Sequence, residues 1–467
     1  MTPTAPASGT TPDALGGWLD EHGTTSVRTE GASLDGLVIG KHLSRAKFER
    51  TLPLGPALAD LVFWWDLGGT PQLGWWAEFR QPAIGDIHQR PDLSTIVASP
   101  NRRGMANVIV DHMTIDGTPL PICPRVVLKR VVDQLSQRGF AAMAAYELEF
   151  MLFNDSYDAA RRKRYRGLSP MGMPLPMGYT THNAHYVAPF MDDVVRRLEG
   201  MDIPWEAWSD EAGPGQVELN FEPTDAVTAA DRVFRAKQVI KEVALDRGVS
   251  ATFMAKPTDD YGNGMHIHHS LRREGNAAFF DEQAGDRRSS VMRHWIGGLV
   301  ATMPAAVSLL DPTVNSYRRM VGFAAAPTTP TWCEENKSTG LRVISRSEKL
   351  ARVEHRVASA DVNVYLALAT ILAGGIAGLD GAIEPPPEHR GIAWGEPPGS
   401  PKLPASISLA AEELTGDKLL AGVLGSEFVD YWLHTRRWEW LMFHTGGGDA
   451  QATAVTDWEL GRYFELV

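Results

Sequence analysis

Hydrophobic and polar positions alternate with period two in the stretch AYELEFMLF, residues 145–153. Alternation of this kind predicts a half-buried β-strand with its apolar side chains on one face. The opposite face carries Glu147 and Glu149, whose positions would lie about 7 Å apart. Two carboxylates on a half-buried face repel each other and lose hydration, so packing alone does not explain this strand.

Strand and helix patterns continue along the chain from about residue 140. The predicted strands cover 141–153, 215–221, 263–271 and 351–357, and the predicted helices cover 188–201, 225–248, 289–310 and 361–379. Two segments, 157–180 and 382–404, lack periodicity, and loops of this length are usually functional or mobile. The pattern predicts an α+β fold with a large antiparallel sheet.

The N-terminal part of the chain has a different pattern. Residues 24–120 contain short β-like runs between turn residues, which predicts a small, mostly β domain. A proline-led amphipathic helix follows, and we place the domain boundary at its start, giving domains at 15–120 and 121–467. Residues 1–14 have neither a basic start nor an apolar core, so we expect a disordered tail and not a signal peptide.

Composition and charge limit the class of protein. The net charge of −12 argues against general nucleic-acid binding, which needs a basic surface. No run of 18 apolar residues is found, so we expect no membrane span. Two cysteines, Cys123 and Cys333, cannot form a disulfide framework, which fits a reducing cytoplasm, and we expect packed thiols.

Four strand-like segments each present charged or imidazole groups on one face. The set is Glu147, Glu149, Glu211, Glu218, His266, His268, Arg352, Glu354 and Arg356. Any one of these groups could be a solvated surface or a satisfied ion pair. Together they point to divalent cations, because uncompensated burial costs several kcal/mol per ion. Carboxylates with one imidazole suit Mg²⁺ or Mn²⁺, and beside several arginines they suit phosphoryl transfer. No P-loop is present, so any nucleotide needs another architecture.

The motifs, taken in order, resemble the glutamine synthetase superfamily. They are YELEFMLF, EAGPGQVELNF, TFMAKPTDDYGNGMHIHHSL, NSYRRMVGFAAAP, ENKSTGLRV and ARVEHRVASADVNVYLALATILAGG. FMAKP, MHIH and RVEHRVASADVN are most similar to the branch that joins glutamate to amines larger than ammonia. The resemblance implies an N-terminal β-grasp domain and a catalytic fold related to that of guanidino kinases.

The resemblance also implies roles for individual residues, with two Mg²⁺ or Mn²⁺ ions and ATP as co-substrate. One ion would be held by Glu149, Glu211 and Glu218, and the other by Glu147, His266 and Glu354. The ATP side would be lined by His268, Ser270, Lys349, Arg342 and Arg352. Glutamate would be bound by Gly262, Arg319 and Arg356, and the residues acting on the reacting groups would be Arg319, Arg342 and Lys337.

The sequence departs from the ammonia-using members at three positions. Their flap has a glutamate two residues before its proline, where this chain has Ala325, and losing that acid favours a bulkier amine. Tyr261 stands where they have an asparagine, which leaves a glutamate analogue conceivable. Lys337 replaces an arginine, keeping the charge but losing the bidentate fork.

Two further residues are candidates for the amine pocket together with Ala325. Tyr179 could match the family's amine-pocket tyrosine. Asp66, at the end of FWWD, could reach a neighbouring subunit's site, or the run could be an aromatic core strand that ends in a turn.

We therefore predict a cytoplasmic ATP-dependent ligase that joins glutamate to a polyamine, ethanolamine or a similar amine through a γ-glutamyl phosphate. The alternatives are ordinary glutamine synthesis from ammonia, a guanidino-phosphotransferase, and a non-catalytic family member. The resemblance implies a homo-oligomer of two stacked hexameric rings.

Overall fold

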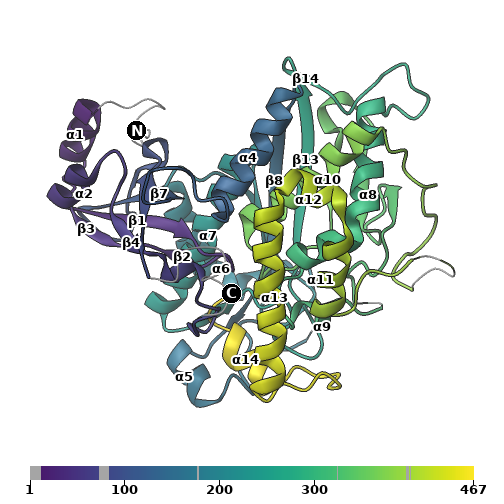
Figure 1. The fold of residues 1–467 in the computed structure, drawn as a ribbon. Helices are drawn as coiled ribbons and strands as arrows, with labels where there is room; N and C mark the ends of the chain where they lie inside the picture. Colours follow the sequence, from purple (N-terminus) through teal and green to yellow (C-terminus); the bar gives the residue numbers. More distant parts are fainter. Residues whose placement is uncertain (1–11, 73–83, 176–177, 323, 396–398, 400) are drawn as a thin grey trace.

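The computed structural model describes residues 12–72, 84–175, 178–322, 324–395, 399 and 401–467. It contains a smaller N-terminal sheet and a larger sheet covered by helices (Figure 1). Most of the predicted tail, residues 1–14, lies outside the described residues. Helix α1, Pro12–Glu21, begins within the predicted tail, so residues 12–14 of that tail are helical.

The N-terminal sheet has the strand order β2-β1-β7-β5-β4, with β3 on β1 and β6 on β7. Its strands are β1 Ser26–Ala32, β2 Val38–Ile39, β3 His42–Ser44, β4 Ala57–Ala59, β5 Asp86–Pro91, β6 Val97–Ala98 and β7 Met105–Met113. The pair β1 and β7 is parallel. Helix α1 and helix α2, Arg45–Thr51, contribute Leu19 and Phe48 to a small core with Val27 and Val108.

The larger sheet runs in the order β15-β16-β17-β13-β8-β10-β9, with β11 and β12 on β8 and β14 on β13. Its strands are β8 Ala141–Phe153, β9 Trp205–Asp210, β10 Gln216–Phe221, β11 Thr224–Asp225, β12 Ser250–Thr252, β13 Met265–Arg273, β14 Asn276–Ala277, β15 Trp332–Glu334, β16 Leu341–Ile344 and β17 Arg352–His355. Among the described strands, β15 and β16 form its parallel pair. The predicted α+β fold with a large, mainly antiparallel sheet is confirmed.

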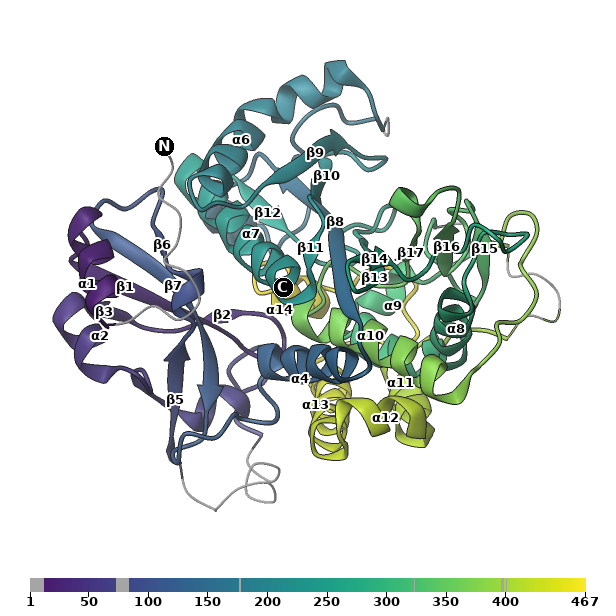
Figure 2. The ribbon, with the colours of Figure 1, turned by 90° about the horizontal axis from the view of Figure 1, so that it is seen from above.

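Helices pack against this sheet and against one another. They are α4 Pro124–Gln137, α5 Tyr157–Arg162, α6 Thr181–Glu199, α7 Ala226–Arg247, α8 Ser290–Leu310, α9 Ser316–Arg319, α10 Val364–Gly381, α11 Ile407–Gly416, α12 Lys418–Leu424, α13 Ser426–Thr445 and α14 Asp457–Tyr463. Figure 2 shows α10 lying between α4 and α8. Helices α8 and α10 approach closely at Gly298, where an added Cβ would lie 2.3 Å from the carbonyl oxygen of Gly374.

Helix α10 is the one described helix that is long and apolar enough to cross a membrane, although it is not a continuous run of 18 apolar residues. It passes that test by length and composition, but 83% of the 18-residue window is buried inside the protein. The burial marks it as a core helix, packed between α4 and α8.

Other predicted boundaries need adjustment. Helix α6 begins at Thr181, before the predicted residue 188, and the predicted loop 157–180 contains the short helix α5. Strand β17 ends at His355, so Arg356 lies just beyond it.

Candidate active site

Strand register gathers the predicted acids and histidines on one face of the larger sheet. Glu149 lies opposite Glu218 across β8 and β10. Glu147 lies opposite His266 across β8 and β13. Because all these strand pairs are antiparallel, side chains that alternate along each chain meet in one cluster.

Glu147 is the centre of the first half of the cluster. Its carboxylate lies 3.0 Å from Nδ1 of His266 and 2.9 Å from Nε2 of His268. Burial opposes ionisation, but the hydrogen bonds and charges of the two imidazoles outweigh it and lower the pKa of Glu147. Arg352 Nε donates to Nδ1 of His268 at 3.2 Å, which extends the chain of polar contacts.

Glu354 adds a second acid to this half. It is 1% exposed, and its oxygens accept from Arg342 Nη1 at 3.0 Å and from Arg356 Nη1. Burial raises its pKa, but Arg356 and the two histidines overcome that effect, so the net shift is downward. This half is therefore well supplied with positive partners.

The second half contains Glu149, Glu211 and Glu218 and has fewer positive partners. Glu149 accepts from the Gly264 N–H at 2.7 Å and from Gln216 Nε2 at 3.0 Å. Burial, together with the charges of Glu147, Glu149 and Glu211, raises the pKa of Glu218 to about 8. Burial and the charge of Glu149 also raise the pKa of Glu211. These acids lack a counter-charge that a bound cation would supply.

Two trios of ligand atoms lie close enough to share an ion. In each, the ligand atoms are within 4.8 Å of one another, and the trios are Glu147, Glu218 and His266, and Glu147, His268 and Glu354. Oxygen-rich sets with an imidazole fit a hard divalent cation. The grouping differs from the predicted trios, since Glu147 belongs to both and His268 stands beside Glu354.

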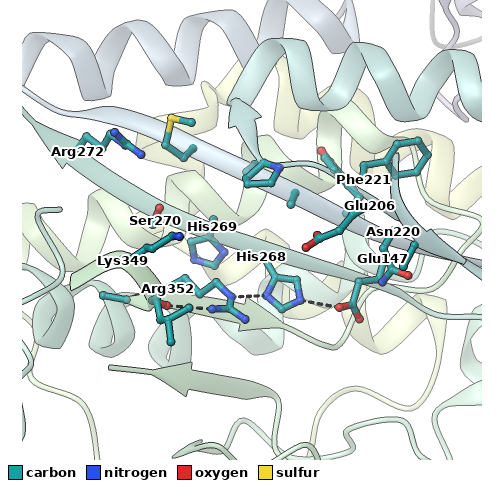
Figure 3. Close-up of a pocket in the computed structure, with 18 residues that line it drawn as sticks. Glu147, Glu206, Asn220, Phe221, His268, His269, Ser270, Arg272, Lys349 and Arg352 are labelled. Carbon is teal, nitrogen blue, oxygen red and sulfur yellow. Dashed lines mark hydrogen bonds and ion pairs between the residues drawn. The ribbon is translucent and has the colours of Figure 1, made fainter. Parts of the chain in front are cut away.

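A pocket of about 670 Å³ opens next to Glu147 (Figure 3). Four of the five residues predicted to line the ATP side line this pocket, namely His268, Ser270, Lys349 and Arg352, whereas Arg342 does not. Lys349 and Arg352 bring positive charge to the side away from the acids, so the pocket has an anion-attracting wall beside a cation-attracting cluster.

The residues predicted to bind glutamate lie next to the half of the cluster that contains Glu149. Arg319 is 5% exposed and donates to the Val357 carbonyl at 2.9 Å. An added Cβ on Gly262 would lie 3.1 Å from Arg319 Cγ and 2.6 Å from the Ala255 carbonyl oxygen, so only glycine fits there. Arg356, which pairs with Glu354, connects this region to the first half.

Tyr179 and Ala325 lie on exposed loops. Tyr179 is 70% exposed and has a φ of 59°, and its hydroxyl hydrogen bonds to Glu211. That contact places Tyr179 at the cluster. Ala325 is an exposed loop residue after α9, with a φ of 59°.

Asp66 does not lie in the cluster of its own chain, and its predicted place in a neighbouring subunit's amine pocket stays a prediction. Its side chain is 2% exposed, lies 3.1 Å from Arg462 Nη2 and accepts from Trp438 Nε1 at 3.0 Å. The carboxylate is held by these two contacts and also accepts from the N–H groups of Gly68 and Thr70. Phe63 ends a 3₁₀ turn and not a strand.

Lys337 lies before β16, whereas Arg342 lies within that strand. Lys337 is exposed in the loop before the strand. Arg342 donates to Glu354 and, through Nη2 at 2.6 Å, to Glu335. Glu335 therefore orients Arg342 toward the cluster.

Gln216 is a site residue that the sequence reasoning missed. Its Nε2 donates to Glu149 and to the Gly262 carbonyl at 2.9 Å, so it joins the acid cluster to the loop predicted to receive glutamate. The period-two spacing of the strand could have indicated it, because Gln216 stands two residues before Glu218 and so shares its strand face.

Residues 121–463 match the family described as glutamine synthetase, catalytic domain. That is more than half of the chain, which therefore belongs to the glutamine synthetase family.

Individual relatives agree with this assignment. Type-1 glutamine synthetase 2 of Dictyostelium discoideum is 31% identical over 454 residues, covering 94% of this chain and 84% of the relative. A gamma-glutamylethanolamide synthetase of Streptomyces coelicolor is 33% identical over 382 residues, covering 82% of this chain and 79% of the relative. A solved structure of apo GmaS without ligand is 25% identical, with a TM-score of 0.82, and covers 95% of this chain and 98% of that one.

Proposed function

We propose that this chain is an ATP-dependent ligase that joins glutamate to an amine other than ammonia. The observation that carries the proposal is the cluster of acids and histidines on β8, β10, β13 and β17 beside a pocket lined by Lys349 and Arg352. Such a site can hold a polyphosphate and activate a carboxyl group next to it.

The residues divide the work by position. His268, Lys349 and Arg352 bind the nucleotide phosphates, and Arg319 and Arg356 hold the carboxylates of glutamate. The cluster of Glu147, Glu149, Glu211, Glu218, His266 and Glu354 would hold two divalent ions, Mg²⁺ or Mn²⁺, which would screen the charges of the two approaching anions. Gly262 leaves room for the amino group of the acid substrate.

The reaction proceeds in two steps. The γ-carboxylate of glutamate attacks the γ-phosphate of ATP, which gives an acyl phosphate and ADP. An unprotonated amine then attacks the acyl carbon and displaces phosphate, forming the amide. Arg342, oriented by Glu335 and Glu354, stands where it can stabilise the developing negative charge. Lys337 contributes a second positive charge from its exposed loop.

The amine preference rests on Ala325 and on the relatives. Ala325 removes both charge and volume from the flap, which favours a substrate bulkier than ammonium. The name of the Streptomyces relative specifies ethanolamide synthesis, and polyamines or similar amines remain in the same class. The Dictyostelium relative is named a glutamine synthetase at comparable identity, so glutamine synthesis is the alternative.

Further parts of the proposal concern the whole molecule. The parallel pair of β1 and β7 supports a β-grasp domain, and the family match from residue 121 supports domains at 15–120 and 121–467. We also propose a cytoplasmic homo-oligomer of two hexameric rings. The kinship of the catalytic fold with guanidino kinases stays a prediction.

A phosphate-release assay with ATP, glutamate and single amines tests the proposal. The panel contains ammonium, methylamine, ethanolamine, putrescine, longer polyamines and aniline. We expect at least one organic amine to exceed ammonium in kcat/KM by an order of magnitude or more, with amide confirmed by mass spectrometry. Turnover with ammonium alone would assign glutamine synthesis instead.

A further inference from the structure

The C-terminal helix α14 contains a carboxylate that the site described above does not use. Glu459 is fully buried, at 0% exposure. In Figure 1, α14 is the yellow helix beside the base of α13. A buried carboxylate is costly unless polar partners surround it, so its contacts indicate what it holds in place.

The two oxygens of Glu459 share Arg318, whose Nη2 donates to Oε2 at 3.4 Å, and otherwise have different partners. Oε2 accepts from the Thr456 N–H at 2.9 Å and from the Thr456 hydroxyl at 2.7 Å, which closes a capping box within α14 itself. Oε1 accepts from Asn315 Nδ2 at 3.1 Å and from Arg318 Nε at 3.2 Å, both more than 140 positions earlier in the chain. A helix cap needs only the first set of contacts.

Asn315 passes the connection on to a second loop. It is fully buried, its Oδ1 accepts from the Lys256 N–H at 2.7 Å, and its Nδ2 donates to the Lys256 carbonyl at 3.0 Å. Lys256 opens the segment 256–262, which ends at Gly262. A second tether reaches the same segment, because the Val455 N–H donates to Asp259 Oδ1 at 2.8 Å.

Arg319 completes the path. It follows Asn315 in the same turn, which forms α9, and its side chain packs over Gly262. The C-terminal segment therefore contacts both segments that bind glutamate in the proposed function. It contacts the α9 turn through Asn315 and Arg318. It contacts the 256–262 loop through Asn315 and Asp259.

We propose that Glu459 is a positioning residue for the acid-substrate pocket, acting through its Oε1 contacts on Asn315 and Arg318. This inference rests on the proposed function for its kinetic consequence, but the contacts stand without it. None of the residues that contact Glu459 lines the nucleotide pocket. Loss of these contacts should therefore weaken the binding of glutamate and not that of ATP.

The test compares three variants of the full chain. Glu459→Gln keeps the shape but replaces one acceptor oxygen with a donor, which cannot satisfy both sets of partners. Thr456→Ala is the matched control, because it removes the capping hydroxyl and leaves the Oε1 contacts intact. Asp259→Ala removes the second tether at an exposed position and should fold in any case.

We expect Glu459→Gln to raise the KM for glutamate about tenfold, as loss of a buried charged acceptor implies, with the KM for ATP changed less than about twofold. Asp259→Ala should raise the glutamate KM about threefold. Thr456→Ala should lower Tm without altering either KM. Equal changes in Tm and in both KM values for Glu459→Gln and Thr456→Ala would show that Glu459 only caps its helix and would overturn the proposal.

Hydrogen–deuterium exchange separates this inference from the proposed function. Amides of residues 256–262 and 315–320 should exchange faster in Glu459→Gln than in wild type or Thr456→Ala. If the wild type showed no glutamate-dependent ATP cleavage, the proposed function would fail while exchange still decided the positioning role. If Glu459→Gln does not fold, Asp259→Ala provides the test. Unchanged amide exchange of residues 256–262 in that variant would count against a positioning role of the C-terminal segment.

Discussion

The two halves of the acid cluster differ in the positive charge that faces them. Around Glu147 and Glu354, the protein supplies His266, His268 and Arg356, and both carboxylates have lowered pKa values. Around Glu218 and Glu211, the near neighbours other than His266 are carboxylates and neutral donors, and both pKa values are raised. One half is compensated by side chains, and the other is not.

This difference indicates where a cation matters most. A half that is already compensated keeps its geometry without an ion, whereas an uncompensated half binds a proton or a cation to relieve repulsion. The dependence on metal should therefore be concentrated on the Glu149, Glu211 and Glu218 side.

The largest effect is expected from removing an acid of the uncompensated half. Glu211→Ala or Glu149→Ala should reduce kcat/KM by about a thousandfold or more, because a carboxylate that holds the cation is lost. Steady-state phosphate release measures this, with Glu282→Gln on an exposed loop as control. Activity near the wild-type value in either alanine variant would break the proposed site.

The next effect concerns pH and metal affinity. At pH 6 to 7, Glu218, with a pKa of about 8, is mostly protonated without metal, so a dication must displace that proton. Lowering the pH by one unit in this range should weaken Mn²⁺ binding about tenfold per proton displaced, and the dependence should level off above pH 8. Isothermal titration at several pH values measures it.

A matched variant identifies the source of that pH dependence. Glu218→Gln cannot titrate, so its Mn²⁺ affinity should be weaker and much flatter between pH 6 and 8. Glu147, in the compensated half, should add no pH dependence to the Mn²⁺ affinity in this range, because its pKa is already low. A slope as steep in Glu218→Gln as in wild type would assign the proton to another group.

Smaller changes are expected in the amine preference. Ala325→Glu restores a flap acid and should shift the ratio of kcat/KM for ammonium over the preferred amine upward by about fivefold, since it adds a negative charge near a cationic substrate. Val321→Glu, an exposed position in the same loop, is the control and should leave the ratio unchanged. An unaltered ratio in Ala325→Glu would count against the flap argument.

The smallest effect is predicted for Tyr179. Tyr179→Phe removes the hydroxyl that bonds to Glu211 but keeps the ring, so kcat/KM should fall about two- to fivefold, as expected for one partly exposed hydrogen bond. The same amine panel measures it. A loss as large as that of Glu211→Ala would mean that the hydroxyl takes part in the chemistry.

Local patterns in the sequence predicted the bounds of strands and helices correctly where the hydrophobic periodicity was long and regular. Strand β8 spans Ala141–Phe153 as predicted, because alternation over that length leaves little choice of register. The acids Glu147 and Glu149 could therefore be placed on one face. Helix α7 likewise begins near its predicted start, where Asp225 caps it by accepting from Thr228.

Contacts between distant segments could not be predicted from local patterns. Nothing around Glu459 indicates that it meets Asn315, since the contact depends on how α14 packs in three dimensions. Arg356 was placed on a strand face, yet the strand ends one residue earlier and the Arg356 N–H donates to the Gly340 carbonyl. The grouping of Glu147 with both histidines also depends on strand register across β13.

The most direct test of the central claim is a crystal structure with Mn²⁺ and a non-hydrolysable ATP analogue, with anomalous scattering used to locate manganese. The account predicts two anomalous peaks over β8, one bonded to Glu149, Glu211 and Glu218 and one bonded to Glu147, His266 and Glu354, with phosphates beside Arg352. Density for the nucleotide elsewhere, and no manganese peak between these strands, would contradict it.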